Sequence, residues 1–250
     1  MYDSLKKLAK RLLPASWLKK NEQALRRLIA WQYKGSKYQC NICKAKLRLF
    51  PTNKLQQKIC PNCGSLARTR GLWDLIQNEI KGKTILHFSP PVSLRKAIEN
   101  RIATGKYITS DFAGEFDSDL KINIEDIDLE DDYFDLIICY HVLEHVTNDK
   151  KAISELFRIL KPVGICYIQT PFKEGEIWDD EQINTPELRL KHYGQADHLR
   201  VYSADGLTVR LEDAGFDVER IERVNEPENH NGFKPRDTIL KGRKFNSNSN

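Results

Sequence analysis

The sequence lacks any uninterrupted apolar run of about 18 residues, the length that a membrane-spanning helix requires. Its N-terminus also lacks the apolar stretch and small-residue cleavage site of a secretory signal, so we expect a cytoplasmic protein. Disulfides are not expected either, because the six cysteines fall as two CxxC pairs and two single residues, a usage typical of metal binding in a reducing compartment. With 40% hydrophobic and 30% charged residues, the chain is neither fibrous nor wholly disordered.

Acidic residues are scarce in the first third of the chain. Residues 1–82 hold 18 lysines and arginines but only 4 acidic residues, whereas residues 83–250 hold 22 basic and 31 acidic residues. The formal net charge of +5 therefore conceals a basic front and an acidic body. A length of 250 residues allows a small domain beside one of standard size.

A basic helical arm is predicted for residues 1–38. Leucines recur at helical spacing from Leu5 to Leu13 with lysines and arginines between them, and the pattern resumes after Pro14 up to Trp31. The arm holds 10 basic and 2 acidic residues. Three roles stay open: packing on the acidic body of the same chain, contact with an anionic membrane surface through residues 1–33, or contact with nucleic-acid phosphates.

The strongest local signal is a pair of cysteine motifs in residues 39–82. Cys40 and Cys43 are followed, after 16 residues, by Cys60 and Cys63, a spacing typical of a four-thiolate zinc ribbon. Four thiolates leave no open coordination position, so such a Zn²⁺ ion is structural. The alternative is a set of free, buried cysteines. A strand over residues 46–50 and a linking helix that starts at Gly71 are expected to complete the segment.

Residues 83–244 alternate between strand-like and helix-like patterns, which predicts a doubly wound α/β sheet. Strands are expected at 84–88, 106–112, 134–140, 164–169, 217–224 and 237–244, and helices at 93–101, 149–160 and 203–214. Ser203 is the expected N-cap of the last helix. Residues 245–250 are expected to form a disordered tail. Ligands bind at the carboxyl ends of such strands, so functional residues are expected just after Phe88, Thr109, Ile122, Cys139 and Thr170.

Two motifs in this body resemble class I S-adenosylmethionine-dependent methyltransferases: FDLIICYHVLEHV at residues 134–146 and ELFRILKPVG at residues 155–164. A closer similarity, to bacterial methyltransferases of the type 11-like group, rests on CPNCGSLAR at residues 60–68 and DHLRVY at residues 197–202. The resemblance implies a Rossmann-like sheet, S-adenosyl-L-methionine as cofactor and transfer of its methyl group. A Rossmann-like enzyme that uses a dinucleotide is the alternative.

The predicted cofactor loop departs from the class. Most members have a glycine-rich turn after the first strand, whereas this chain has HFSPPV at residues 87–92, and two prolines make such a turn rigid. The closer group has a similar turn with proline, so the resemblance implies a variant pocket that includes Phe88, Ser89 and Pro90. A cofactor site that has lost its function is the alternative.

The resemblance also implies which individual residues make the other contacts with the cofactor. Asp111, at the end of the second strand, stands where the class has the acid that holds the ribose hydroxyls. A carboxylate suits that role because it accepts two hydrogen bonds. Asn123, followed by Ile124, stands where relatives often have an Asp near the adenine; Asn can still accept a hydrogen bond but lacks the charge. Tyr140 and His141 follow the central strand, beside the expected sulfonium.

Histidines are the candidate proton acceptors, because their ordinary pKa lies near neutrality. The methyl group is already activated, so the protein has mainly to align the acceptor and remove a proton from a hydroxyl. His198 or His141 is the expected general base, with Arg200 on an anionic part of the acceptor. In one alternative, Glu144 and His145 only cap the next helix and brace the cofactor loop. The other is a divalent-metal site, similar to the ExxEH-plus-His site of some class I methyltransferases, formed by His141, Glu144, His145 and His198.

A small molecule or a glycan precursor is the expected acceptor, because the closer group is associated with such pathways. RNA is the second candidate, since a zinc ribbon before a class I domain also resembles a bacterial ribosomal-RNA guanine methyltransferase. The acidic body disfavours broad phosphate binding. A third hypothesis is a degenerate methyltransferase fold that acts as a binding subunit. Residues 170–198 are long for a connection and are expected to cover the strand ends as a lid.

Overall fold

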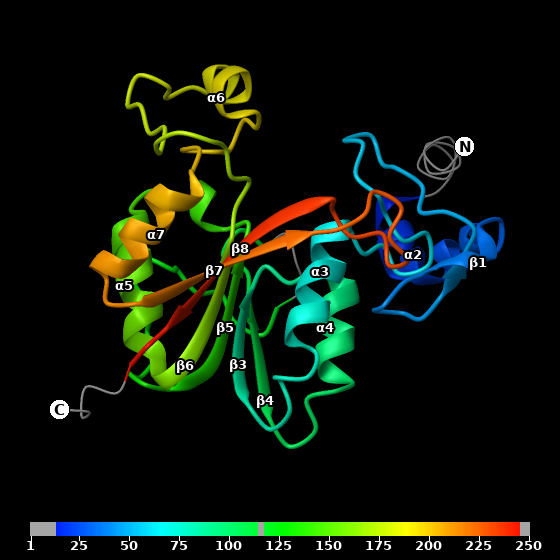
Figure 1. Cartoon of the computed structure of the whole chain (residues 1–250), viewed down its shortest axis with the longest axis horizontal. Helices are drawn as coiled ribbons and strands as arrows, with labels where there is room; N and C mark the ends of the chain where they lie inside the picture. Colours follow the sequence, from blue (N-terminus) through cyan, green and yellow to red (C-terminus); the bar gives the residue numbers. More distant parts are fainter. Residues whose placement is uncertain (1–13, 115–117, 246–250) are drawn as a thin grey trace. The chain divides into compact units, whose positions relative to one another are not determined.

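The computed structural model describes residues 14–114 and 118–245. The leucine pattern of residues 5–13 and the predicted tail beyond residue 245 lie outside the described residues. The chain divides into two compact units (Figure 1). Unit 1 comprises the described residues up to 79 together with 91–101 and 223–237, and unit 2 comprises residues 80–90, 102–222 and 238–245. None of the helices in the described ranges combines the length and the apolar character needed to cross a membrane.

Unit 2 is built on a six-stranded sheet with the order β4-β3-β5-β6-β8-β7. Four strands are parallel, namely β3 (Thr84–Phe88), β4 (Lys106–Ser110), β5 (Phe134–Tyr140) and β6 (Leu160–Gln169), as Figure 1 shows. The last two are β7 (Asp217–Val224) and β8 (Arg236–Arg243), and β8 runs antiparallel to β6. After β3 the chain adds β4 on one side and β5 on the other. Ligands of such sheets bind at the carboxyl ends where the strand order reverses.

The central strand reads as one apolar run because both of its faces are buried. Leu136, Ile137 and Ile138 of β5 are each 0% exposed, and Leu136 pairs with Ile85 of β3. Cys139 is equally buried, and burial raises the pKa of its thiol well above the ordinary value. This cysteine is therefore a protonated core residue of the sheet.

Helices α5 (Asp149–Ile159) and α7 (Ala204–Asp213) lie side by side in unit 2 (Figure 1). Each begins at a side-chain cap: Asn148 accepts a hydrogen bond from the Lys151 N–H at 3.0 Å, and Ser203 accepts one from the Gly206 N–H at 3.1 Å. The predicted N-cap at Ser203 is confirmed. Apolar residues of both helices, such as Leu156, are fully buried in the same core as the sheet.

The connection between β6 and α7 folds around a small core of its own. It contains helix α6 (Pro186–Tyr193), and its buried residues are Ile183, Tyr193 and Val201. The Asp180 N–H donates to the Tyr193 hydroxyl at 3.0 Å, and the rings of Trp178 and Tyr193 pack edge to face with centroids 5.5 Å apart. A short 3₁₀ helix, η1 (Leu143–His145), precedes α5.

Unit 1 contains α2 (Ala15–Trp31), the strand pair β1 (Lys34–Gln39) and β2 (Lys46–Leu47), α3 (Ala67–Ile76) and α4 (Val92–Glu99). Its first part packs around Tyr33, Tyr38 and Phe50, with the rings of Tyr38 and Phe50 edge to face at 5.8 Å. The buried sulfurs of Cys40 and Cys60 belong to the same core. A hydrophobic core this small contributes little stability by itself, so the fold of this part depends on the bonds that its cysteines make.

Most predicted elements are confirmed, and the differences have local causes. Strands 84–88, 134–140 and 217–224 have the predicted bounds. The predicted strand over 46–50 was too long, because pairing with β1 ends at Leu47 and Phe50 turns into the core. The helix predicted from Gly71 begins at Ala67, and β6 begins at Leu160 because this residue already pairs with Phe134.

Candidate functional site

Ser89 and Asp111 meet where β3 and β4 end. Phe88 and Ser110, the last residues of these strands, are register partners, so the residues after them leave the sheet at the same edge. Ser89 Oγ donates to Asp111 Oδ1 at 2.7 Å, and Asp111 is 4% exposed. The carboxylate is thereby held in one orientation at the reversal of strand order, where a ligand hydroxyl would find a charged acceptor.

The turn after β3 adopts a glycine-like conformation without glycine. Ser89 has φ +46°, in the left-handed region, and its N–H donates to the Ser110 carbonyl at 2.7 Å. Pro90 is buried and Pro91 precedes α4 with φ −60°. A left-handed serine costs about 1–3 kcal/mol of strain. The two hydrogen bonds of Ser89 and the rigid prolines hold the residue in this conformation.

Asn123 and Ile124 lie in the loop that follows β4. The Ile122 N–H donates to Ser110 Oγ at 3.1 Å, which ties this loop to the end of the strand. Ile124 is 6% exposed and belongs to the core of unit 2. Asn123 is exposed, and its Oδ1 accepts a hydrogen bond from the Glu125 N–H at 3.1 Å. The amide of Asn123 therefore stabilises its own turn at the surface.

His141 turns the chain away from the sheet directly after Tyr140, the last residue of β5. It has φ +56°, and its N–H donates to the Gln169 carbonyl at the end of β6, at 2.8 Å. Its Nδ1 lies 3.2 Å from Glu144 Oε1, and Glu144 is 1% exposed. A carboxylate beside Nδ1 favours the tautomer with its proton there, so Nε2 is the basic nitrogen of the ring.

Glu144, His145 and His198 form a cluster in which one ligand atom of each lies within 4.8 Å of the others. The rings of His145 and His198 pack edge to face with centroids 4.8 Å apart, and His198 is 4% exposed. Within residues 14–114 and 118–245, Glu144 Oε2 and His198 Nε2 have no hydrogen-bond partner, and neither has Thr170 Oγ1 after β6. Buried polar atoms of this kind are normally satisfied by a ligand, an ion or water. Thr170 is a candidate contact that the sequence indicated only as a strand end.

Burial also sets the protonation of His198. It lowers the pKa of this ring below the ordinary value of 6.5, although the charges of Glu144 and Asp197 oppose the shift. A neutral imidazole at pH 7 is the form that accepts a proton. The cluster therefore has the chemistry of a general base or of a ligand set for a cation.

Arg200 is bound within the protein. Its Nε donates to Asp179 Oδ2 at 2.8 Å, and its two terminal nitrogens donate to three main-chain carbonyls of residues 143–147. The residue is 4% exposed. Arg200 thus holds the segment that carries Glu144 and His145, and its predicted contact with an anionic acceptor stays a prediction.

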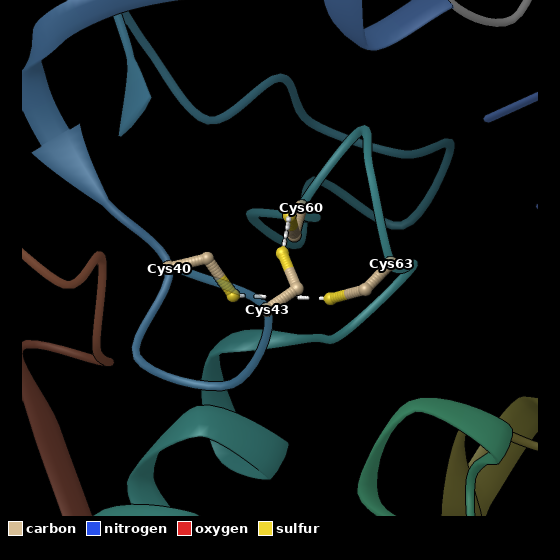
Figure 2. Close-up of side chains that lie close together, drawn as sticks. All are labelled: Cys40, Cys43, Cys60 and Cys63. Carbon is tan, nitrogen blue, oxygen red and sulfur yellow. Dashed lines mark hydrogen bonds between the residues drawn. The ribbon is translucent and has the colours of Figure 1, made fainter. Parts of the chain in front are cut away.

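The four cysteines of the CxxC motifs converge in unit 1 (Figure 2). Cys40 Sγ lies 3.8 Å from Cys63 Sγ, and Cys43 Sγ lies 3.7 Å from Cys60 Sγ. A tetrahedron with Zn–S bonds of about 2.3 Å has edges of about 3.8 Å. These two pairs of sulfurs therefore already have the separation that a zinc ion requires.

The two cysteine motifs fold into the same turn. In the first, the Lys44 N–H donates to the Cys40 carbonyl at 2.8 Å, and in the second the Gly64 N–H donates to the Cys60 carbonyl at 2.9 Å. Lys44 has φ +59° and Gly64 has φ +79°. One local geometry used twice aims two pairs of sulfurs at a common centre.

The charges around the sulfurs favour a bound cation. The hydrogen-bonded sulfur of Cys40 raises the pKa of Cys60 and of Cys63, because a second thiolate beside a first is disfavoured. A divalent ion would remove that penalty and let all four thiols ionise.

Arg70 links the cysteine cluster to a distant part of unit 1. It is 0% exposed, donates to the Ser65 carbonyl at 2.6 Å and to the Asn231 carbonyl at 2.8 Å, and lies 4.1 Å from the centroid of the Phe50 ring. Burial lowers the pKa of Arg70, while the charges of the four cysteines oppose that shift. Ionised cysteines therefore stabilise the buried guanidinium, and the guanidinium offsets their charge.

The mixed six-stranded sheet with its helices resembles the Rossmann-like methyltransferase fold. Residues 74–221 match the model of a methyltransferase-domain family, and the chain belongs to that family. A probable S-adenosylmethionine-dependent methyltransferase of Mycolicibacterium smegmatis is 33% identical over 97 residues, which are 39% of this chain and 34% of that protein. The match thus spans about a third of the relative's length.

Solved structures share the fold at low sequence identity. An S-adenosylmethionine-dependent methyltransferase from Archaeoglobus fulgidus is 15% identical with a TM-score of 0.50, over 70% of this chain and 92% of that chain. Burkholderia thailandensis 1,6-didemethyltoxoflavin-N1-methyltransferase, with bound 1,6-didemethyltoxoflavin and S-adenosylhomocysteine, is 13% identical with a TM-score of 0.50, over 72% and 79% of the two chains. The predicted Rossmann-like fold and the resemblance to class I methyltransferases are confirmed.

Proposed function

We propose that this protein transfers the methyl group of S-adenosyl-L-methionine to a small-molecule or glycan-type acceptor. The observation that carries the proposal is the buried carboxylate of Asp111, held by Ser89 at the reversal of strand order in a member of a methyltransferase family. A fixed carboxylate at that place suits a pair of ribose hydroxyls, since it accepts two hydrogen bonds at once.

The residues present fit the cofactor along the carboxyl edge of three strands. When bound, S-adenosyl-L-methionine supplies a methyl group on a positively charged sulfur. Asp111 would hold the ribose, and Asn123 and Ile124 would border the adenine. The left-handed conformation of Ser89 lets the main chain turn after β3 in the way that glycine allows in a glycine-rich loop. The residues proposed along the methionine part and the sulfur are Phe88, Ser89, Pro90, Tyr140 and His141.

His198 is the proposed general base for a hydroxyl acceptor, with His141 as the second candidate. Its buried Nε2 and its lowered pKa support this role, because a neutral nitrogen without a protein partner in the described chain can take a proton. Arg200 is proposed as a positioning residue. Its hydrogen bonds to main-chain carbonyls fix residues 143–147, which include the Glu144 and His145 of the His198 cluster.

The charge of the body supports a small acceptor over RNA. Residues 83–250 hold 31 acidic against 22 basic residues, and a surface with that balance repels a polyanion. The folded connection over residues 170–198, with its half-exposed Trp178, is proposed as the lid that shapes the acceptor pocket.

We further propose that Cys40, Cys43, Cys60 and Cys63 bind one structural Zn²⁺. The sulfur separations of 3.7 and 3.8 Å support zinc, and four thiolates leave no position for a substrate. This metal would stabilise unit 1 and take no part in methyl transfer.

Calorimetric titration of the purified chain with S-adenosyl-L-methionine and with S-adenosylhomocysteine tests the function. We expect binding of both, followed by transfer of labelled methyl from the cofactor to a component of fractionated cell extract. The fraction that takes the label identifies the acceptor class. A folded protein that binds neither molecule would instead support the degenerate, partner-binding hypothesis.

Replacing His198 with glutamine is expected to lower the turnover number about 10²–10⁴-fold, the usual contribution of a general base. In the unaltered protein, activity should rise with pH through the pKa of His198. Because burial lowers that pKa below 6.5, the rate should be level at and above neutrality and should fall only in acid. The variant should lack this acid limb.

His230→Gln is the matched control, because His230 is a histidine of unit 1 outside the proposed site. Elemental analysis separates the base from the metal alternative. If His198 is a general base, the unaltered protein and His198→Gln should each contain one zinc per chain. A second metal ion that the variant loses would assign Glu144, His145 and His198 to a cation site, and an unchanged turnover number would remove His198 from the chemistry.

A further inference from the structure

Helix α2 carries an apolar stripe on a side that faces solvent. Trp17, Leu28 and Trp31 are 44%, 73% and 78% exposed. With Ala24, which is also exposed, they recur at spacings of seven, four and three residues, which place all of them on one face of an α-helix. At about 1.5 Å per residue, the stripe is about 21 Å long.

The other face of α2 holds the helix in unit 1. Ile29 packs against the core formed by Tyr33, Leu47 and the buried cysteines. Arg26 lies against Gly64 in the second cysteine turn, where its guanidinium carbon would be 2.9 Å from an added Cβ. A surface helix ordinarily buries its apolar face and exposes polar residues. The exposed stripe of α2 therefore takes no part in the packing of the described residues of unit 1, and apolar patches of this kind mark interaction sites.

The segment of the chain that carries the stripe is rich in basic residues. Arg27 is exposed on the same helix. The acidic residue of α2, Glu22, lies on the far side, where its carboxylate pairs with Arg26 at 2.7 Å. The chain over residues 1–38 holds 10 basic and 2 acidic residues. Tryptophan and leucine on one face of a helix in a basic segment form the pattern of a helix that lies in the interface of an anionic bilayer.

We propose that α2 docks this protein on an anionic membrane surface, with Trp17, Leu28 and Trp31 inserted at the level of the lipid headgroups. The helix would lie parallel to the surface, since its stripe runs along its whole length. A nucleic acid is the less suitable partner, because stacking would use the tryptophans and gain nothing from Leu28. The docking does not depend on the proposed methyl transfer, and it is measured without cofactor or acceptor.

The test is co-sedimentation of the full chain with phosphatidylcholine vesicles that contain or lack phosphatidylserine. We expect binding to the anionic vesicles, weaker binding at high salt, and a blue shift of tryptophan fluorescence on binding. Leu28→Glu and Trp31→Glu should each lower the partition coefficient between water and anionic vesicles at least about tenfold. Each substitution removes apolar area from the membrane interface and adds a charge that the anionic lipids repel.

Val209→Glu is the matched control, because Val209 is a 54% exposed apolar residue on α7. It should bind vesicles as the unaltered protein does. The proposal is overturned if Leu28→Glu binds equally well, or if neutral vesicles bind as strongly as anionic ones. It is also overturned if the fluorescence shift arises with an RNA oligonucleotide, or on self-association of the chain, in the absence of any response to vesicles.

Discussion

Cys60→Ser is expected to abolish zinc binding and to unfold the cysteine-rich part of unit 1. Four thiolates at zinc separations contribute their binding free energy to folding, about 10–16 kcal/mol for a structural site at neutral pH. Serine is a poor zinc ligand, and the core around Tyr33 and Phe50 is too small to replace that stabilisation. Zinc content should fall from one ion per chain to about none. Amide hydrogen exchange should show loss of protection in residues 33–66.

Cys166→Ala is the matched control for this prediction. Cys166 is a 0% exposed cysteine of β6, in the other unit, so its loss should cost only the stability of a small buried side chain and leave zinc content unchanged. Full zinc occupancy in Cys60→Ser, or protection of residues 33–66 without metal, would contradict the structural zinc. Loss of zinc from both variants would show that the effect is not specific to the four-cysteine cluster.

Asp111→Ala is expected to raise the dissociation constant for S-adenosyl-L-methionine at least about 100-fold. Two hydrogen bonds to a buried carboxylate are lost together, and bonds to charged groups contribute about 1.5–3 kcal/mol each. The Ser89 hydroxyl would also lose its acceptor, which loosens the left-handed turn. Calorimetry on the folded variant measures the change directly, before any acceptor is known.

Asp213→Ala is the comparison for Asp111→Ala, because it removes an exposed acid at the end of α7. Its affinity for the cofactor should match that of the unaltered chain. The affinity of Asp111→Asn for the cofactor should lie between those of the other two variants, since the amide keeps one acceptor oxygen and loses the charge. An affinity in Asp111→Ala equal to that of the control would remove Asp111 from the cofactor site.

Some of the fold was predictable because its signals are local. The apolar run over residues 134–140 is typical of a buried central strand, and Ser203 before an amphipathic pattern is typical of a helix cap. The bounds were less predictable where pairing decides them. β6 extends back to Leu160 because Phe134 is available as its partner, and β2 stops at Leu47 where β1 has no further partner for it.

Parts of the candidate site also follow from local sequence, whereas other parts depend on tertiary packing. The meeting of the four sulfurs follows from two short CxxC turns, each of which determines its own geometry. The contact of Ser89 with Asp111 needs the parallel register of β3 and β4, and the sequence separates the two residues by 22 positions. The surroundings of Arg200 depend still more on packing, because its partners at residues 143–147 are more than 50 positions away.

By itself, the sequence determined the alternation of strands and helices, the cysteine cluster and the class of fold, because each depends on periodicity and on neighbours a few residues apart. Only the tertiary structure decided which buried groups meet. Arg70 reaches the Asn231 carbonyl across 161 positions of the chain, and the stripe of Trp17, Leu28 and Trp31 faces solvent because Ile29 occupies the inner side of α2. Contacts of this kind are selected by the packing of the whole molecule, which no local pattern encodes.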